Sequence, residues 1–280
     1  MKILARYVSS LLFIAFLFVP IRAMAQGVQD FVITKFDASY ELSNEDPQGL
    51  LTTKETIDLN FSGQNHGILR AIPQKYGDVD THPKVKSVMR DGNSEPYVTY
   101  TENDNLVLRI GDAGKFITGV HNYVIEYAVE NVITFYDDHD ELFWDVNGND
   151  WLQTFESVSA SLVDTGSGPT TANPGVACFT GSFGSTERSC EVLPGSRSFS
   201  VHTTRPLHAS ETLTFVAAFS KGYFTPMSWA ERYREWLIAS PAFLLQLFAV
   251  RSAHKKWQKL GKDPKKRGIT VPYFERPKGM

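Results

Sequence analysis

Hydrophobic and polar residues alternate in short runs between residues 30 and 222, with the period of two that is typical of half-buried β-strands. No stretch of ten or more residues in this region has the i, i+3, i+4 spacing of a helix. The clearest run is Leu51–Phe61, where one face of a strand would carry Leu51, Ile57, Leu59 and Phe61. Glu55 is the one charged residue on that apolar face.

Turn-forming sequences such as Asn147-Gly148 separate these runs, and alternation returns at residues 123–129 and 213–219. Roughly ten to twelve short strands at this spacing favour two packed sheets over a closed barrel. We therefore expect an all-β domain over residues 26–224, with an immunoglobulin-like two-sheet β-sandwich as its fold.

The pattern changes near the carboxyl end, where Trp236–Val250 is interrupted by few polar residues. These 15 residues would span roughly 22 Å as a helix, whereas a bilayer core is about 30 Å thick. A helix that begins near Trp229 reaches roughly 33 Å. We predict a membrane helix over residues 229–252; the alternative is an amphipathic helix that lies in the membrane interface.

The charge beside this helix predicts its orientation. Residues 251–280 contain ten Lys or Arg and two acidic residues, a net charge of +8. Positive charge next to a membrane segment stays in the cytoplasm, so residues 253–280 are expected to form a basic cytoplasmic tail. The preceding domain would then be extracytoplasmic, in a single-pass protein of the cell membrane whose partners include membrane lipid.

The amino terminus has the features of a secretory signal peptide. Lys2 and Arg6 precede an apolar stretch, Leu11–Val19, and Ala23-Met24-Ala25 matches a cleavage site. We expect residues 1–25 to be a signal peptide; the alternative is an uncleaved anchor. Both interpretations place the β domain, from residue 30 onward, outside the cytoplasm.

The charge of the expected β domain excludes one class of partner. Residues 26–224 contain 27 Asp or Glu and 13 Lys or Arg, a net charge of −14. Nucleic acids require a positive surface, so no nucleic-acid partner is expected.

The chain has two cysteines, Cys178 and Cys190. An exported chain meets an oxidising compartment, so a disulfide bond is expected, with free thiols as the alternative. Two cysteines without a nearby histidine are too few for a zinc site.

Arg70 is a candidate partner for Glu55, because a half-buried carboxylate needs one. The alternative is a binding role, in which His66 and Arg70 hold an anionic wall polymer or a carboxylate of a partner. Asp138, Asp140 and Glu141 are weak candidates for a metal site, since they lie in the densest group of oxygen ligands. A solvated acidic turn is the favoured interpretation.

Catalytic motifs are absent from the sequence, including G-x-S-x-G, H-E-x-x-H and a glycine-rich phosphate loop. We therefore expect no enzyme activity and no cofactor. Trp144, Trp151 and Tyr136 are candidates for a sugar platform, although strand aromatics are more often core residues.

Three blocks in order resemble a known family. They are Leu51–Pro73, which ends in HGILRAIP; Glu141–Trp151, with the sequence ELFWDVNGNDW; and the cysteine loop from Cys178 to Cys190. The chain is similar to the YciQ-like predicted membrane proteins of bacteria, a family defined by a domain of unknown function. Members of that family carry further membrane helices, so the resemblance implies a shortened member or a fragment.

We expect from these observations a membrane-anchored envelope protein that binds another envelope protein or a cell-wall component. The alternative is a carbohydrate-binding module or a hydrolase that acts on the cell wall.

Overall fold

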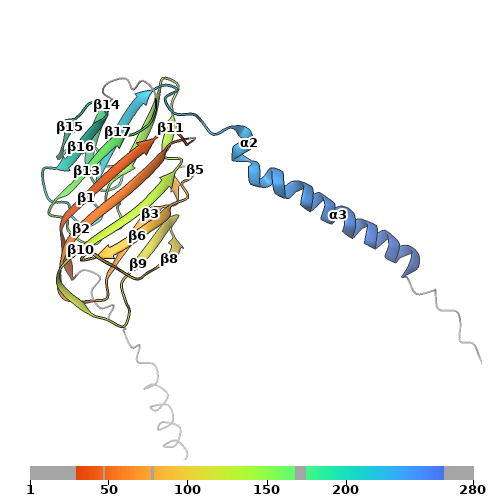
Figure 1. The fold of residues 1–280 in the computed structure, drawn as a ribbon, viewed down its shortest axis with the longest axis horizontal. Coiled ribbons are helices and arrows are strands. Elements are labelled where there is room, and N and C mark those ends of the chain that lie inside the picture. Colours follow the sequence, from red (N-terminus) through yellow and green to blue (C-terminus); the bar gives the residue numbers. More distant parts are fainter. Residues whose placement is uncertain (1–29, 47, 77–78, 168–174, 262–280) are drawn as a thin grey trace, which may run out of the picture. The chain divides into compact units, whose positions relative to one another are not determined.

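A computed structural model of the chain describes residues 30–46, 48–76, 79–167 and 175–261 (Figure 1). The chain divides after Pro226 into a β domain and a helical unit. The predicted signal peptide at residues 1–25 lies outside the described residues, as does the end of the predicted tail, 262–280.

The described part of the β domain contains seventeen strands. In chain order they are β1 Phe31–Ser43, β2 Leu50–Asn65, β3 Ile68–Pro73, β4 Lys75–Tyr76, β5 Val79–Asp80, β6 Lys84–Arg90, β7 Asn93–Ser94, β8 Tyr97–Glu102, β9 Asn105–Ile110, β10 Ile117–Glu130, β11 Ile133–Phe135, β12 His139–Asp145, β13 Val158–Asp164, β14 Gly175–Gly181, β15 Cys190–Pro194, β16 Ser198–Thr203 and β17 Thr212–Ser220. The all-β prediction is confirmed.

The largest sheet has eight strands in the order β15-β16-β13-β1-β2-β10-β6-β7. Figure 1 shows its long central strands β1, β2 and β10 side by side. Alternate residues of these strands are buried, as their hydrophobic pattern predicts. The register places Ala38, Glu55 and Ile125 in one row on the buried face, so Glu55 lies in the middle of the core.

A second layer covers this buried face and consists of separate sheets. A four-stranded sheet, β11-β12-β17-β14, packs its aromatic residues on the large sheet. The ring of Trp144 lies 6.2 Å from that of Tyr40, and the ring of Phe215 lies 5.2 Å from that of Phe199. A three-stranded sheet, β3-β9-β8, places the Arg70 guanidinium 5.6 Å from the centre of the Phe36 ring. A two-stranded sheet pairs β4 with β5.

The immunoglobulin-like part of the prediction has no support in this topology. An immunoglobulin domain has two antiparallel sheets of seven to nine strands in all. Here β1 runs parallel to β13 in the large sheet, and the opposing layer is divided. The hydrophobic pattern identifies which face of a strand is buried, but it does not identify the partner of that strand.

The predicted helix at the carboxyl end forms as α2, Trp229–Arg232, and α3, Arg234–Leu260. Among the described residues, however, no helix combines the length and the apolar character needed to cross a membrane. The apolar run Trp236–Val250 has 15 residues, and charged residues flank it within α3. The prediction of a spanning helix at 229–252 is therefore not supported, and the reason is the short apolar run.

Candidate functional site

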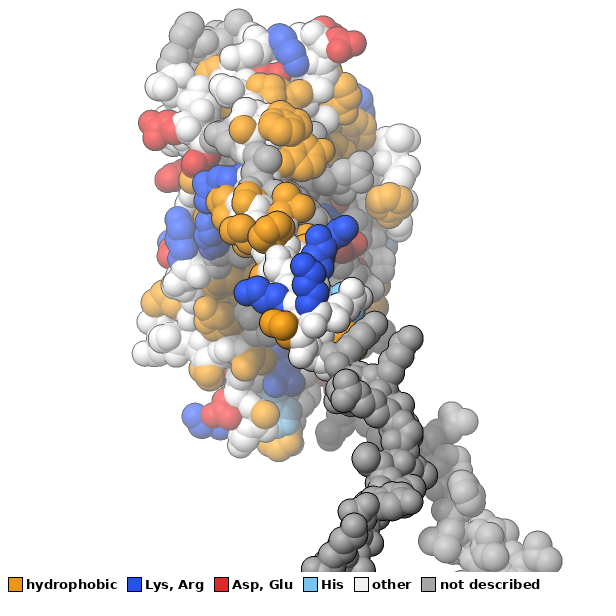
Figure 2. All heavy atoms as spheres, turned by 90° about the vertical axis from the view of Figure 1, so that its right-hand side faces the viewer, with side chains coloured by type: hydrophobic (Ala, Val, Ile, Leu, Met, Phe, Trp, Pro, Cys, Tyr) orange, Lys and Arg blue, Asp and Glu red, His pale blue; other side chains and the backbone are white. Residues whose placement is uncertain are grey.

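A cleft of about 890 Å³ lies between the three-stranded sheet and the segment from Trp144 to Gln153. The side of the domain to the right in Figure 1 carries β3, β5 and β8, and Figure 2 shows hydrophobic side chains beside Lys and Arg side chains there. The residues that line the cleft are Phe31, Asn65, Gly67–Ala71, Pro73, Lys75, Tyr76, Tyr100, Glu102, Asn103, Asn105, Val107, Trp144, Asp145, Asn147–Gln153 and Phe183.

The turn between β8 and β9 determines which backbone groups of the three-stranded sheet are paired. Glu102 and Asn105 face each other across a two-residue turn, in which Asn103 and Asp104 have φ values of 49° and 58°. Such a turn is flanked by a pair that exchanges both backbone hydrogen bonds, and this pairing alternates along antiparallel strands. The odd-numbered residues of β9 therefore bond to β8, and its even-numbered residues bond to β3.

Strand β3 consequently has an open edge among the cleft residues. Arg70 faces Leu108 of β9, so its backbone groups point toward β9. Leu69 and Ala71, the neighbours of Arg70 in β3, direct their backbone N–H and C=O groups away from β9. The Ala71 C=O accepts a hydrogen bond from Arg70 Nη1 at 2.7 Å, in agreement with this direction. Within the described part of the chain, no acceptor is found for the N–H of Leu69 or Ala71.

The structure brings the predicted pair Glu55 and Arg70 together beneath this cleft. Arg70 Nε and Nη2 donate to the two Glu55 carboxylate oxygens at 2.7 and 2.6 Å, and both side chains are at most 3% exposed. Tyr127 donates its hydroxyl to the same carboxylate at 2.6 Å. Burial disfavours the charge on Arg70, but the attraction to Glu55 outweighs it and raises the pKa of Arg70. Burial, followed by the charge of Glu55, raises the pKa of Tyr127.

Arg70 also holds the opposite wall of the cleft. Its Nη1 donates to the Asn147 C=O at 3.0 Å, and its Nη2 donates to the Val146 C=O at 3.3 Å. The Asn147 C=O accepts a second hydrogen bond, at 2.8 Å, from Trp151 Nε1. The buried ion pair is therefore connected to the backbone of both walls.

The side chain of Asn147 fixes the same wall to β17. Its Oδ1 accepts from the backbone N–H of Leu213 at 2.9 Å and from Thr212 Oγ1 at 3.1 Å, while its Nδ2 donates to the Glu211 C=O at 3.0 Å. A buried amide that makes these three bonds satisfies most of its hydrogen-bonding capacity. The wall from residue 145 to residue 153 is consequently built before any ligand arrives.

Polar side chains in the cleft are mainly amides and carboxylates. Asp145 is half-buried and accepts from Thr214 Oγ1 at 2.5 Å, and burial raises its pKa. Asn65 Nδ2 and Asn149 Oδ1 are inaccessible to solvent and have no hydrogen-bond partner among the described residues. Both residues line the cleft, but these two atoms lie beneath its surface.

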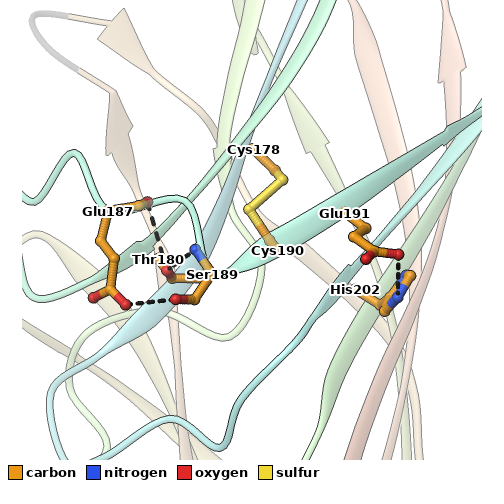
Figure 3. The surroundings of a disulfide bond; sticks show 7 residues. All are labelled: Cys178, Thr180, Glu187, Ser189, Cys190, Glu191 and His202. Carbon is orange, nitrogen blue, oxygen red and sulfur yellow. Dashed lines mark hydrogen bonds and ion pairs between the residues drawn. A yellow bond between two sulfur atoms is a disulfide. The ribbon is translucent and has the colours of Figure 1, made fainter.

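The predicted disulfide between Cys178 and Cys190 is present, and it joins β14 to β15 (Figure 3). These strands are edge strands of the four-stranded and eight-stranded sheets, so the bond links the edges of the two layers. The loop between the cysteines carries Phe183, which is 92% exposed at the rim of the cleft.

Hydrogen bonds hold this loop in shape. Thr180 donates its backbone N–H to the Glu187 C=O at 2.7 Å, and Ser189 Oγ donates to Glu187 Oε1 at 2.6 Å (Figure 3). Arg205 donates to both carboxylate oxygens of Glu187 at 2.9 and 2.7 Å. The hydrogen bonds from Arg205 and Ser189 lower the pKa of Glu187 to about 2.

His66 does not join Glu55 and Arg70. Its Nδ1 lies 2.8 Å from the Lys115 C=O, and its ring lies 4.2 Å from that of Phe116. The binding role suggested for His66 with Arg70 therefore has no support, because the Arg70 guanidinium is directed into the core.

The acidic residues considered for a metal do not converge on one point among the described residues. Asp140 is buried, and its Oδ2 accepts from the backbone N–H groups of Gly222 and Phe224 at 3.0 and 3.2 Å. Asp138 is exposed and pairs with His139, whose hydrogen bond lowers the pKa of Asp138. In the described ranges, no group of three or more His, Cys, Asp or Glu side chains is placed to hold a metal ion.

The aromatic residues considered as a sugar platform are also separated. Trp144 and Trp151 are buried, and Trp144 Nε1 donates to Tyr40 Oη at 3.1 Å. Tyr136 is exposed and stacks on His139 at 4.7 Å. The two tryptophans are thus core residues.

Comparisons with known proteins agree with the resemblance found in the sequence. Residues 32–219 match the family model described as the predicted membrane protein (DUF2207) N-terminal domain. The uncharacterized protein YciQ of Escherichia coli strain K12 is 29% identical over 201 residues, which cover 67% of this chain and 31% of YciQ. The chain thus spans about a third of the length of this curated relative.

Two solved structures show a weaker likeness. Yeast LTA4 hydrolase in complex with bestatin has a TM-score of 0.45 at 11% identity, over 67% of this chain and 28% of that chain. The M1 zinc metallopeptidase from Deinococcus radiodurans has a TM-score of 0.38 at 9% identity, over 68% and 43% of the two chains. These scores are too low to transfer fold or function. The family match, in contrast, covers more than half of the chain, and the chain belongs to the DUF2207 family of predicted membrane proteins.

Proposed function

We propose that the β domain is an extracytoplasmic recognition domain of a cell-envelope protein, and that the cleft beside β3 is its binding site. The observation that carries this proposal is the preformed cleft of about 890 Å³, whose far wall is held by Arg70 and Asn147. Ligand sites are usually concave, largely preformed and about 300–1,000 Å³ in volume. A rigid wall reduces the entropy that binding would otherwise cost.

The proposed activity is binding rather than catalysis. None of the described residues that line the cleft is Ser, Thr, Cys or His, so the side chains of a Ser or Cys hydrolase are not gathered there. A second candidate is carbohydrate hydrolysis or carbohydrate binding at the cell wall. It is favoured by the raised pKa of Asp145, because glycosidases use one protonated and one ionised carboxyl group.

The proposal includes attachment to the membrane through α3. Ile238, Phe243, Leu244 and Phe248 are large hydrophobic side chains of this helix that are exposed, and Lys255 and Lys256 follow them. Such a sequence favours contact with lipid and with anionic headgroups. The full chain should sediment with the membrane fraction, and replacement of Phe243, Leu244 and Phe248 by Ser should release it; a chain that stays in the soluble fraction would contradict attachment through α3.

The binding site is tested by photo-cross-linking of the full chain in living cells. A benzophenone amino acid replaces Leu152, which is 48% exposed in the cleft, or the control residue Val163, which is 45% exposed on β13 outside it. We expect a specific adduct from position 152 and none from position 163. No adduct at either position, or equal adducts at both, would overturn the proposed function.

A further inference from the structure

The open edge of β3 is the feature of the cleft that identifies a class of ligand. The N–H groups of Leu69 and Ala71 point away from β9, and the described residues offer them no acceptor. Both residues line the cleft. Two residues along a strand are about 6.8 Å apart, so the cleft presents two backbone donors with the repeat of a β-ladder.

We propose that this cleft binds an extended polypeptide segment of another protein, which adds to the edge of β3 as a further strand. The inference rests on the proposed function and names the ligand class for the same site. A peptide repeats its C=O groups at the spacing of the two donors, whereas the hydroxyls of a glycan have no such repeat. Proteins normally protect an edge strand with charge, proline or a covering loop, and β3 carries a proline only at its last residue, Pro73.

Charge defines the segment further. The described residues that line the cleft include three carboxylates, those of Glu102, Asp145 and Asp150, and the ammonium group of Lys75. Arg70 adds no net charge because it is paired with Glu55. The segment is therefore uncharged or basic, since an acidic segment would meet like charge.

Side chains on both walls complete the site. The side chains of Leu69 and Tyr100 are exposed on the three-stranded sheet, and that of Phe183 is exposed at the rim. A strand that adds to an edge gains affinity from its backbone and specificity from pockets for alternate side chains.

Proline substitutions remove the proposed backbone donors one at a time. Ala71→Pro removes an N–H that points into the cleft, and edge strands tolerate proline at such positions. Thr99→Pro is the matched control, because Thr99 of β8 faces Leu108 and directs its N–H to the opposite edge of the same sheet. Both variants carry the benzophenone group at Leu152, and their thermal melting shows whether they fold.

We expect mass spectrometry to identify the adduct at position 152 as a segment of another protein. Ala71→Pro should reduce its yield about tenfold, the effect of leaving one ligand carbonyl unpaired, and Thr99→Pro should leave it unchanged. If Ala71→Pro does not fold, Leu69→Pro takes its place with the same expected loss. A full yield from the folded variant would overturn the inference.

The outcomes separate this inference from the proposed function. A glycan adduct, or an adduct with another segment of this same chain, would overturn the inference that the ligand is a segment of another protein. Either result would leave the cleft as a binding site. The absence of any adduct would overturn both.

Discussion

The buried ion pair of Glu55 and Arg70 allows a quantitative test of the core. Each side chain is at most 3% exposed, and two charge-assisted hydrogen bonds of 2.6 and 2.7 Å join them. Glu55→Ala leaves an unpaired guanidinium in the core, and Arg70→Ala leaves an unpaired carboxylate. Either change is expected to lower the free energy of unfolding by about 3–5 kcal/mol, because a buried charge without a partner is costly.

The double variant distinguishes a coupled pair from two independent residues. If the residues acted independently, the losses would sum to about 6–10 kcal/mol, which approaches the whole stability of a domain. Because the double variant removes both charges, we expect it to lose only about 3–5 kcal/mol. The remaining loss reflects the cavity and the three backbone carbonyls that Arg70 no longer contacts.

Urea denaturation of the full chain, followed by tryptophan fluorescence, measures these free energies of unfolding. Each single variant should also melt roughly 6–20 °C below the parent chain. Lys84→Ala is the control, because Lys84 is 68% exposed in its ion pair with Glu130 and its loss should leave the midpoint of unfolding nearly unchanged. Additive losses in the double variant would refute the interpretation of Glu55 and Arg70 as one coupled unit.

Three further predictions concern the disulfide, the acid range and metal. Reduction of the Cys178–Cys190 bond, or its replacement by two serines, should lower the free energy of unfolding in urea by about 3 kcal/mol; an unchanged midpoint would contradict a stabilising role. The pKa of Glu187 is lowered to about 2, so its contribution to stability is complete above its ordinary value of 4.5 and is lost as the pH falls toward 2. As the pH falls across that range, the melting temperature of Glu187→Gln should decrease less than that of the parent chain. An equal decrease in both chains would show that the Glu187 carboxylate does not contribute. Millimolar Ca²⁺ and EDTA should give the same melting temperature, because Asp140 already accepts two backbone hydrogen bonds; a rise with Ca²⁺ would reveal a calcium site.

Single strands of this fold are predictable from the sequence, because alternation within a strand reports which face is buried. Glu55 interrupts an apolar face, so the need of a buried carboxylate for a partner pointed to Arg70. The structure places the two in contact. Similarly, two cysteines in a chain that we expected to be exported predicted the bond that joins β14 to β15.

Such patterns do not predict which strands pair with one another. β1 pairs in parallel with β13, more than a hundred residues later, and no local signal specifies that choice. The cleft was missed for the same reason. Leu69 and Ala71 are ordinary strand residues in the sequence, and only the sheet order β3-β9-β8 leaves their backbone exposed. The Asn147-Gly148 pair correctly indicated a turn, but the bonds from Asn147 to Thr212 and Leu213 depend on tertiary contacts.

Arg70 reaches the far wall through main-chain carbonyls, those of Val146 and Asn147. Every amino acid has a carbonyl, so the course of this segment does not depend on the side chains at positions 149, 150 and 152. Exchange of those three residues is therefore expected to leave the backbone path unchanged. Under the proposed function, the same exchange would change the ligand that the cleft selects, so selectivity and architecture would be encoded by different atoms of one short segment.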